Sequence, residues 1–229
     1  MGFALLTPQR RGFDARLGMR TVAPRRSALA ATLRAIAMGA AIGLGMVVLA
    51  ANPAYAMAEA TGQTILPKQS VSAPLGARAL CQRYDWACAP SAQGAVTEAQ
   101  AMLELADRIN QSINRGVREI TDQRQYQRQD HWALPTLEGG DCEDFALLKK
   151  RELIRAGIAP DRLRIATVLD QAHQAHAVLI LRTPRGDYVL DNLTDQIKPW
   201  DQTGYAFLRM QDPRVASGWS LILMGGIFG

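Results

Sequence analysis

The sequence is poor in the residues that build cysteine-based metal sites and in apolar runs that cross membranes. Its 229 residues include three cysteines and three histidines. No CxxC pair is present and the histidines lie far along the chain from Cys81 and Cys88, so a zinc site built on these thiols is not favoured. After residue 56 no stretch is long and apolar enough to span a bilayer. Internal repeats and low-complexity tracts are also missing.

A surplus of basic residues is found only in the first part of the chain. The formal net charge is +5. Residues 1–56 hold seven arginines and one acidic residue, so the remainder has 19 basic and 20 acidic side chains, a net charge of −1. The basic balance therefore belongs to the leader, and nucleic acid is not a predicted partner.

Residues 1–56 have the three parts of a secretory signal peptide. A basic region is followed by an apolar stretch at 35–51 and by the small-x-small pattern Ala54-Tyr55-Ala56. We expect cleavage after this motif, export to the periplasm, and no stable membrane insertion of the mature protein. An uncleaved anchor helix is the alternative, although its apolar stretch is at the short limit for a span. Met19 is an alternative start.

The rest of the chain is divided into an arm and one folded domain. Residues 57–94 have several prolines and little periodicity, which predicts an irregular N-terminal arm. Residues 95–229 are predicted to form the domain. Cys81 and Cys88 lie seven residues apart in the arm, and a disulfide or two reduced cysteines are equally open. If they pair, Cys142 is left as an odd thiol, which needs an explanation in an exported protein.

Two helices are predicted at the start of the domain. Thr97 is expected to cap the first, with Gln100 three residues later in a capping-box arrangement. Its apolar residues recur at helical spacing, namely Met102, Ala106, Ile109, Ile113 and Val117. The second helix is expected to begin after Gly139-Gly140 with Asp141 as its N-cap, and to end before Gly157.

Three strands are predicted after the second helix, at 163–169, 177–182 and 188–191. The last two flank a turn-forming stretch and are expected to form an antiparallel hairpin. The core is completed by aromatic residues of the tail, namely Trp200, Tyr205, Phe207 and Trp219. Helices that precede strands predict an α+β fold, with N-terminal helices packed on an antiparallel sheet.

Three residues of this predicted fold have the chemistry of a catalytic triad. Cys142 lies in the first turn of the second helix, where unpaired N–H groups and the helix dipole stabilise a thiolate. A nucleophile of this kind needs a base, and His176 directly precedes a predicted strand that would hold it rigidly. Asp191 ends the neighbouring strand and is expected to orient the imidazole of His176. We expect an offset of about three residues between His176 and Asp191, on the order of 10 Å, which a bulge or a loop end has to close.

Each of the three residues also has an ordinary structural explanation. Cys142 alone fits a buried helix cysteine, His176 a capping histidine and Asp191 a turn residue. Their order along the chain, with each at the end of its element, favours the Cys-His-Asp triad. His173 is a weaker base because it lies in a polar loop, and His131 is expected in a loop before the cysteine.

The motifs around these residues resemble those of the bacterial transglutaminase-like cysteine proteinases of the LapG type. The similar stretches are 132–135, Gly140-Asp141-Cys142-Glu143-Asp144-Phe145-Ala146, His176-Ala177-Val178-Leu179 and Val189-Leu190-Asp191-Asn192-Leu193. The resemblance covers roughly residues 80–219. It implies a papain/transglutaminase-like cysteine proteinase fold and a periplasmic cysteine endopeptidase.

The resemblance also implies a cofactor, a substrate and a partner. Members of the family depend on calcium and cleave large surface adhesins near the N-terminus, which releases cells from a biofilm. The periplasmic domain of an inner-membrane cyclic di-GMP receptor binds the protease. Residue by residue, the resemblance assigns Ca²⁺ to Asp141 and Glu143, whose carboxylates are hard oxygen ligands.

Three alternatives stay open. Acidic residues are also preferred at a helix N-terminus, so Asp141 and Asp144 fit simple capping. The same triad would serve a transglutaminase-like acyl transferase, in which an amine replaces water. A non-catalytic periplasmic binding module would keep the fold as a scaffold.

Overall fold

The computed structural model describes residues 62–89, 95–212, 214–215 and 217–228. The predicted signal peptide and its cleavage site after Ala56 lie outside this part of the chain. None of the helices in these ranges combines the length and the hydropathy that a bilayer span requires.

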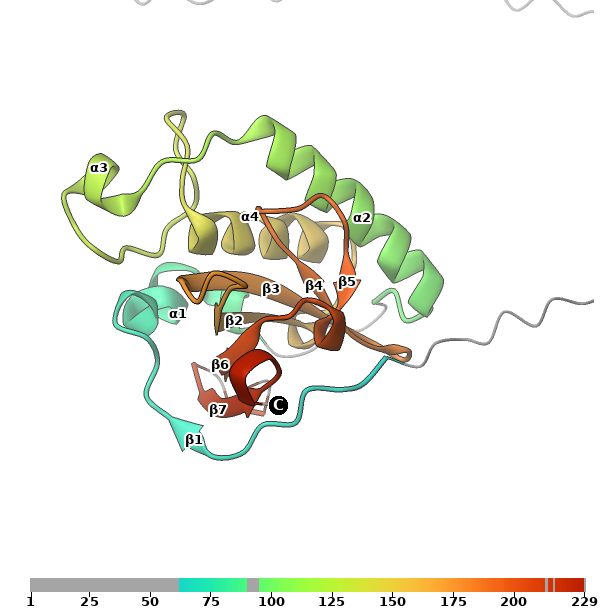
Figure 1. Ribbon diagram of the computed structural model, residues 1–229. Coiled ribbons are helices and arrows are strands. Elements are labelled where there is room, and N and C mark those ends of the chain that lie inside the picture. The colour runs from blue at the N-terminus through green and yellow to red at the C-terminus, as the bar shows by residue number, and fades with distance from the viewer. Residues whose placement is uncertain (1–61, 90–94, 213, 216, 229) are drawn as a thin grey trace, which may run out of the picture. The chain divides into compact units, whose positions relative to one another are not determined.

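An antiparallel sheet is the central element of the described chain. It has seven strands in the order β1-β7-β6-β2-β3-β4-β5 (Figure 1). The strands are β1 (Ser70–Val71), β2 (Leu163–Leu169), β3 (Ala175–Thr183), β4 (Gly186–Leu190), β5 (Lys198–Pro199), β6 (Ala206–Gln211) and β7 (Trp219–Met224). Every pair of neighbours is antiparallel, which confirms the predicted α+β class.

Two long helices lie together on one side of this sheet (Figure 1). They are α2 (Ala99–Gly116) and α4 (Cys142–Arg155). The shorter helical segments are η1 (Gly76–Ala79), α1 (Leu80–Arg83), η2 (Asp85–Cys88), α3 (Asp122–Tyr126), η3 (Pro160–Arg162), η4 (Trp200–Gln202) and η5 (Gly226–Phe228). Helix α4 packs against β3 and β2 as well as α2, so its first residue is fixed relative to the sheet.

The cap of α2 differs from the prediction. Glu98, not Thr97, is the N-cap, and its carboxylate accepts hydrogen bonds from the N–H groups of Gln100 and Ala101. A carboxylate on a longer side chain reaches the same free N–H groups that a Thr hydroxyl would satisfy. The predicted apolar stripe is correct for Met102, Ala106 and Ile113, which are buried, whereas Val117 follows the helix as its C-cap.

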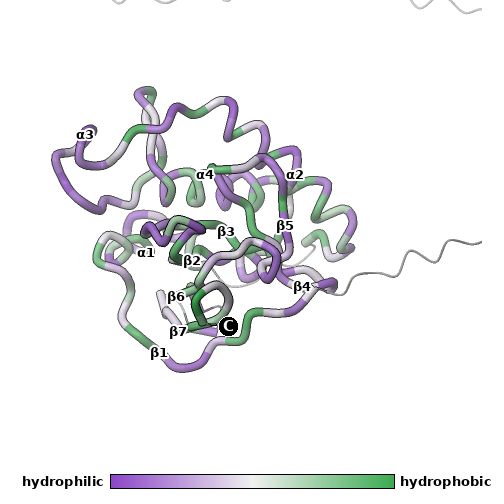
Figure 2. The backbone as a smooth tube through the Cα atoms, viewed as in Figure 1, coloured by the Kyte–Doolittle hydropathy of each residue, from purple (hydrophilic) through white to green (hydrophobic). Residues whose placement is uncertain are grey.

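Two apolar cores lie on the two faces of the sheet. One lies between the sheet and the helices, with Leu147 and Leu153 of α4 against Ile165 and Leu179. The other core contains the strand residues that alternate with those of the first core, together with residues of the C-terminal tail. Among its members are Ile65, Val178, Ile180, Trp200, Tyr205, Phe207 and Ile222. Figure 2 shows apolar strands and a hydrophilic segment around α3. The four tail aromatics that were predicted to complete the core are buried.

The predicted hairpin is present, with small changes of its bounds. Strand β3 begins at Ala175, two residues earlier than predicted, and β4 ends at Leu190, one residue before Asp191. Strand β2 matches its prediction at both ends. Strands β6 and β7 were missed because their residues do not alternate clearly between apolar and polar, and pairing with neighbours forms them.

The cysteines of the N-terminal segment form a disulfide. Cys81 and Cys88 are bonded, with 5.5 Å between their Cα atoms, and Cys142 is free. This settles the alternative that the spacing left open. The odd thiol of the chain is therefore the one at the start of α4.

Candidate active site

A glycine pair sets the entry into α4. Gly139 has a φ of +128°, and a Cβ there would lie 2.0 Å from the carbonyl oxygen of Arg118. A Cβ on Gly140 would lie 2.7 Å from the Asp144 side chain. Only glycine allows both close approaches. The pair therefore lets the chain turn tightly so that Cys142 becomes the first residue of α4.

Cys142 and His176 share one cleft of ≈ 430 Å³. The cleft is formed by the N-terminal end of α4, the start of β3 and the segment around α3. Its lining includes Asp122, Asp130, Trp132, Asp141, Cys142, Glu143, Ala175, His176 and Ala177. The side chains predicted as nucleophile and base thus face the same space, although they are 34 residues apart in the chain.

His176 is hydrogen-bonded to Asp191. Its Nε2 lies 2.8 Å from Asp191 Oδ1, and both side chains are buried. Leu179 pairs with Leu190, and the same register puts Asp191 opposite Val178, two residues from His176. The observed offset is therefore two residues, one fewer than expected. Because strand residues alternate between the two faces, the side chains of His176 and Asp191 lie on one face of the sheet. A loop end closes the gap, because β4 has ended before Asp191 and the β3–β4 ladder has no bulge.

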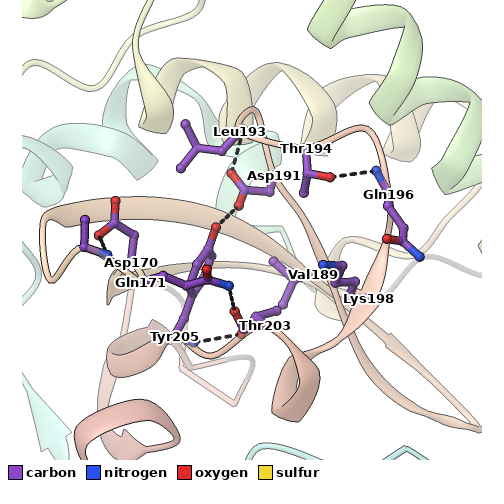
Figure 3. Close-up of a pocket in the computed structure, with 11 residues that line it drawn as sticks. Asp170, Gln171, Val189, Asp191, Leu193, Thr194, Gln196, Lys198, Thr203 and Tyr205 are labelled. Atoms are coloured by element: carbon purple, nitrogen blue, oxygen red, sulfur yellow. Dashed lines mark hydrogen bonds between the residues drawn. The ribbon is translucent and has the colours of Figure 1, made fainter.

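Further donors fix the Asp191 carboxylate. Oδ1 also accepts the Leu193 N–H at 3.1 Å, and Oδ2 accepts the Tyr205 hydroxyl at 2.5 Å (Figure 3). The amide of Asn114, on α2, donates to the Asp191 carbonyl at 2.9 Å. Burial opposes the charge, but the bonds from His176 and Tyr205 outweigh it and hold the pKa of Asp191 below its usual value.

Sequence reasoning missed the contributions of Tyr205 and Asn114. Tyr205 was expected only as a core aromatic, yet its ring also meets the His176 ring edge-on at 6.0 Å. With Asp191 it lines a separate pocket of ≈ 320 Å³ that includes neither Cys142 nor His176 (Figure 3). No local pattern marks either residue, because both reach Asp191 from distant parts of the chain.

The thiol of Cys142 is held by its neighbour. Sγ donates a hydrogen bond to Glu143 Oε2 at 3.1 Å. Burial and then the charge of Glu143 raise the pKa of Cys142, while the backbone N–H of Ala177 acts in the opposite direction. The carboxylate next to the cysteine therefore favours the protonated thiol.

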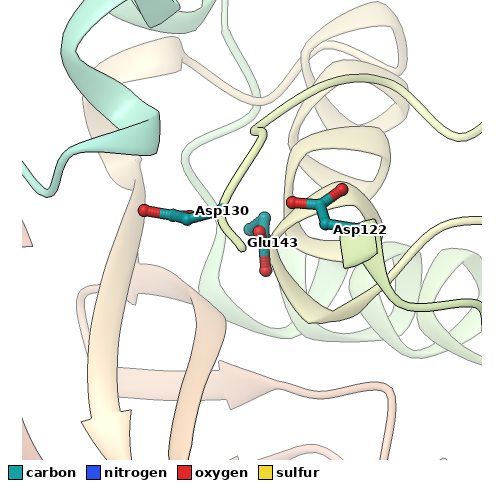
Figure 4. A group of neighbouring side chains, drawn as sticks. All are labelled: Asp122, Asp130 and Glu143. Carbon is teal, nitrogen blue, oxygen red and sulfur yellow. The ribbon is translucent and has the colours of Figure 1, made fainter. Parts of the chain in front are cut away.

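Two acidic groups lie beside Cys142. One contains Asp122, Asp141 and Asp144, and the other contains Asp122, Asp130 and Glu143 (Figure 4). In each group one oxygen per residue lies within 4.8 Å of the others. Burial, followed by the charge of Asp141, raises the pKa of Glu143 to about 9. The predicted ligands Asp141 and Glu143 thus belong to different groups, which Asp122 links.

The first of these groups has free oxygens that fit a cation. Asp141 Oδ2 accepts the Asp122 N–H at 3.0 Å, Asp144 Oδ1 accepts the Ala133 N–H at 2.8 Å, and Asp122 Oδ2 accepts the His131 N–H. The second oxygen of each carboxylate is buried and has no donor among the described residues, namely Asp122 Oδ1, Asp141 Oδ1 and Asp144 Oδ2. Burial also raises the pKa of Asp144 to about 8. Three neighbouring carboxylates that each have one free, buried oxygen suit a hard divalent cation.

Capping does not explain Asp141. It is the residue before α4, as predicted, but its side chain makes no capping hydrogen bond to that helix. Its carboxylate turns to the backbone of α3 instead. Asp122 and Asp130 were not singled out in the sequence, since they lie in a polar stretch without periodicity.

The other two histidines are placed away from the base position. His173 is exposed in the β2–β3 turn and has a φ of +59°. His131 packs edge-on against Tyr126 with 4.7 Å between ring centroids, and its ring nitrogens face Arg83 and Arg128. His176 is the histidine that lines the cleft with Cys142.

Comparison with known proteins places the chain in a family. Residues 67–225 match the family described as bacterial transglutaminase-like cysteine proteinase BTLCP. Calcium-bound Legionella pneumophila LapG is similar at 26% identity and a TM-score of 0.46, over 58% of this chain and 74% of that one. EGTA-treated Legionella pneumophila LapG is similar at 28% identity and a TM-score of 0.45, over 52% of this chain and 67% of that one. Among curated proteins none matches. Because the family match spans more than half of the chain, the protein belongs to the bacterial transglutaminase-like cysteine proteinases.

Proposed function

We propose that the protein is a periplasmic, calcium-dependent cysteine endopeptidase that cleaves a large cell-surface adhesin near its N-terminus and so controls biofilm attachment. The observation that carries the proposal is one cleft that is lined both by Cys142, at the start of α4, and by a histidine that is bonded to a buried aspartate. Membership of a cysteine proteinase family supports the chemistry. The adhesin, the biofilm role and the cyclic di-GMP receptor as partner come from the motif resemblance.

Cys142, His176 and Asp191 are the proposed catalytic triad. Because His176 Nε2 is bonded to Asp191, Nδ1 is the ring atom that takes the thiol proton. Sγ then attacks the scissile carbonyl, and the amine leaves with the proton from His176. Water hydrolyses the thioester and restores the thiol. Asp191 keeps the imidazole in one orientation and stabilises its charged form.

The N-terminal end of α4 is the proposed site for the negative charge of the tetrahedral intermediate. The first N–H groups of a helix have no partner within it, and the helix dipole favours an anion there. The backbone N–H of Cys142 is the proposed oxyanion donor, because it belongs to this first turn.

Ca²⁺ is the proposed cofactor, and the acidic groups beside Cys142 are the proposed site. Asp122, Asp141 and Asp144 would supply their free oxygens, with Glu143 in the adjoining group. The cation supplies positive charge that offsets the carboxylates around the thiol. The proposed ligands are carboxylate oxygens, with no sulfur or imidazole among them. Hard ligands of this kind favour calcium over zinc or copper.

Peptide release from an adhesin is the direct test. The secreted protein is incubated with the N-terminal region of a surface adhesin from the same organism, with Ca²⁺ or with EGTA. We expect two fragments in Ca²⁺, no cleavage in EGTA, and none with Cys142→Ala. Mass spectrometry separates hydrolysis from acyl transfer, because an added amine would appear on the new C-terminus. Full cleavage by Cys142→Ala would contradict the proposal.

Calcium binding is tested separately from cleavage. Asp122 belongs to both acidic groups, so Asp122→Asn should weaken Ca²⁺ binding at least about 10-fold by calorimetry and remove the rise in Tm that Ca²⁺ gives. Asp201→Asn, at an exposed position, is the matched control and should bind as the wild type does. No binding by the wild type at millimolar Ca²⁺ would exclude the cofactor.

Export is tested at the N-terminus. The mature protein should begin at Met57 in the periplasmic fraction when its mass is measured. A full-length species in the membrane fraction would instead support the anchor helix.

A further inference from the structure

A second cavity, distinct from the catalytic cleft, lies further along α4. Its volume is ≈ 210 Å³, and it is lined by parts of η2, α4, η3 and β2 and by residues 211–212, 214–215 and 217–218. The cavity and the cleft have no lining residue in common. Lys150 of the cavity is eight residues after Cys142, which is about 12 Å along the helix. The cavity is therefore unused by the proposed reaction.

Two buried cations line this cavity, and neither forms a salt bridge with a described residue, although the charges of Asp187, Asp161 and Asp212 act on Arg164. Lys150 is 3% exposed, and Nζ donates to Gln211 Oε1 at 2.8 Å. Arg164 is 5% exposed, and Nε donates to the Asp161 carbonyl at 3.4 Å. Within the described ranges neither forms an ion pair with a carboxylate. A buried charge is normally paired, so we expect an anion to bind beside these two side chains.

The acidic residues of the lining do not fill that role. Both oxygens of Asp212 are engaged, by Arg214 at 2.9 and 2.7 Å and by Ser220 at 2.8 Å. Asp161 lines the cavity too, but only its backbone carbonyl accepts a hydrogen bond from Arg164; its carboxylate acts on Arg164 through its charge alone, and among the described residues its Oδ1 is buried without a donor. The lining thus carries three cations and two carboxylates, a surplus of one positive charge.

The lowered pKa of Lys150 is what a buried ammonium group without a salt bridge should have. Its burial, and then the charge of Arg164, lower the pKa of Lys150 to about 7. An anion between the two side chains would reverse both effects, since it replaces lost solvation and screens their repulsion.

We propose that this cavity binds a small oxyanion through Lys150 and Arg164. Inorganic phosphate, sulfate and short carboxylates share the chemistry, namely oxygens that accept from an ammonium and a guanidinium. The cavity is smaller than the roughly 300–1,000 Å³ of pockets for drug-sized ligands, which favours a small ion. A bound anion would join α4 to β2 beside the Cys81–Cys88 disulfide, and so stabilise this end of the fold.

The test measures binding of phosphate, sulfate and acetate to the full secreted protein in separate titrations. Ionic strength and pH 7 are kept constant with chloride. We expect saturable binding with one site by calorimetry and a rise in Tm that levels off. Lys150→Met should abolish both, and Arg164→Gln should weaken binding at least about 10-fold.

Lys149→Met is the matched control. Lys149 is the neighbour of Lys150 on α4 and is equally buried, but its Nζ lies over the Phe145 ring and does not line the cavity. This variant should bind the anion as the wild type does. If Lys150→Met does not fold, the weaker anion binding expected of Arg164→Gln tests the proposal instead.

Two results would overturn the proposal. Phosphate and sulfate raise Tm generally by exclusion from protein surfaces, so an equal rise in wild type and Lys150→Met would show a salt effect only. The absence of calorimetric binding for all three anions at about 10 mM, well above ordinary site affinities, would also exclude the site.

Discussion

At the scale of single residues, Asp191 is the best-supported side chain of the candidate site. A carboxylate that is 2% exposed is costly to bury unless donors replace its water. Asp191 has three such donors, from His176, Leu193 and Tyr205. The orientation of His176 therefore depends on Tyr205, which reaches Asp191 from beyond the β4–β5 hairpin.

Tyr205→Phe should lower kcat about 10-fold with little change in KM, because the imidazole loses part of its support while substrate contacts stay. The missing donor should also raise the pKa of Asp191, which shifts the acid side of the pH profile of kcat/KM upward. Tyr188→Phe on β4 is the matched control and should keep full activity. An unchanged kcat for Tyr205→Phe would limit Tyr205 to a packing role.

The two histidines nearest to β3 should behave differently. His176→Ala should lower kcat by about 10²–10⁴-fold, because it removes the proposed base of the cleft. His173→Ala should have little effect, since that residue is exposed in the turn. Steady-state kinetics of both variants with one adhesin fragment measure this difference in kcat. Comparable losses would mean that the base is assigned wrongly.

At the scale of secondary-structure elements, the site depends on two helices held against the sheet. Helix α4 presents Cys142 at its first turn, and α2 supplies Asn114 to the loop after β4. Asn114 also donates to Thr194 O at 3.1 Å, and Asn110 donates to Asp195 O at 3.0 Å. One helix face thereby fixes the loop that carries Asp191.

The cap of α2 gives a prediction that separates two neighbouring residues. Glu98→Ala should lower Tm by a few degrees, because two N–H groups of the first turn lose their acceptor. Thr97→Ala should leave Tm unchanged, although sequence reasoning made it the cap. Differential scanning calorimetry of both variants measures the difference. Cleavage activity should remain normal in both, since the cap is remote from Cys142.

At the scale of the whole molecule, polar groups close the fold at the end of the sheet. Asp212, directly after β6, binds Arg214 and the Ser220 hydroxyl of β7. The Arg214 hydrogen bond is the main reason that the pKa of Asp212 lies below its usual value of 3.8. Such a group stabilises the folded state above its unfolded pKa, and this contribution is lost as pH falls through the folded pKa.

Asp212→Asn should therefore lower the free energy of unfolding by about 2 kcal/mol at pH 7, the size of a charged hydrogen bond. The gap between wild type and variant should begin to narrow below about pH 4, where the unfolded Asp becomes protonated. Urea denaturation at pH 7, 5 and 3 measures it. A gap of constant size across this range would contradict the assignment.

Much of the site was predictable because its residues sit at the ends of elements with strong local signals. Gly139-Gly140 and the apolar residues after Cys142 locate the start of a helix, and an apolar run after His176 locates a strand. These signals are local, so the order of the proposed nucleophile, base and acid follows from the sequence alone. The antiparallel hairpin and the α+β class follow in the same way.

The tertiary structure decided what depends on contacts between distant segments. It put Asp191 two residues from the position opposite His176, added Tyr205 behind it, and closed the Cys81–Cys88 disulfide. It also divided the acidic residues into two groups joined by Asp122, a residue in a stretch without periodicity. Hydrogen bonds and ligand groups form between atoms a few ångströms apart, whatever their separation in the chain. The sequence by itself determined the two long helices, strands β2 to β4 and the order of the proposed site residues, and only packing of α3, α4 and the sheet decided which side chains meet.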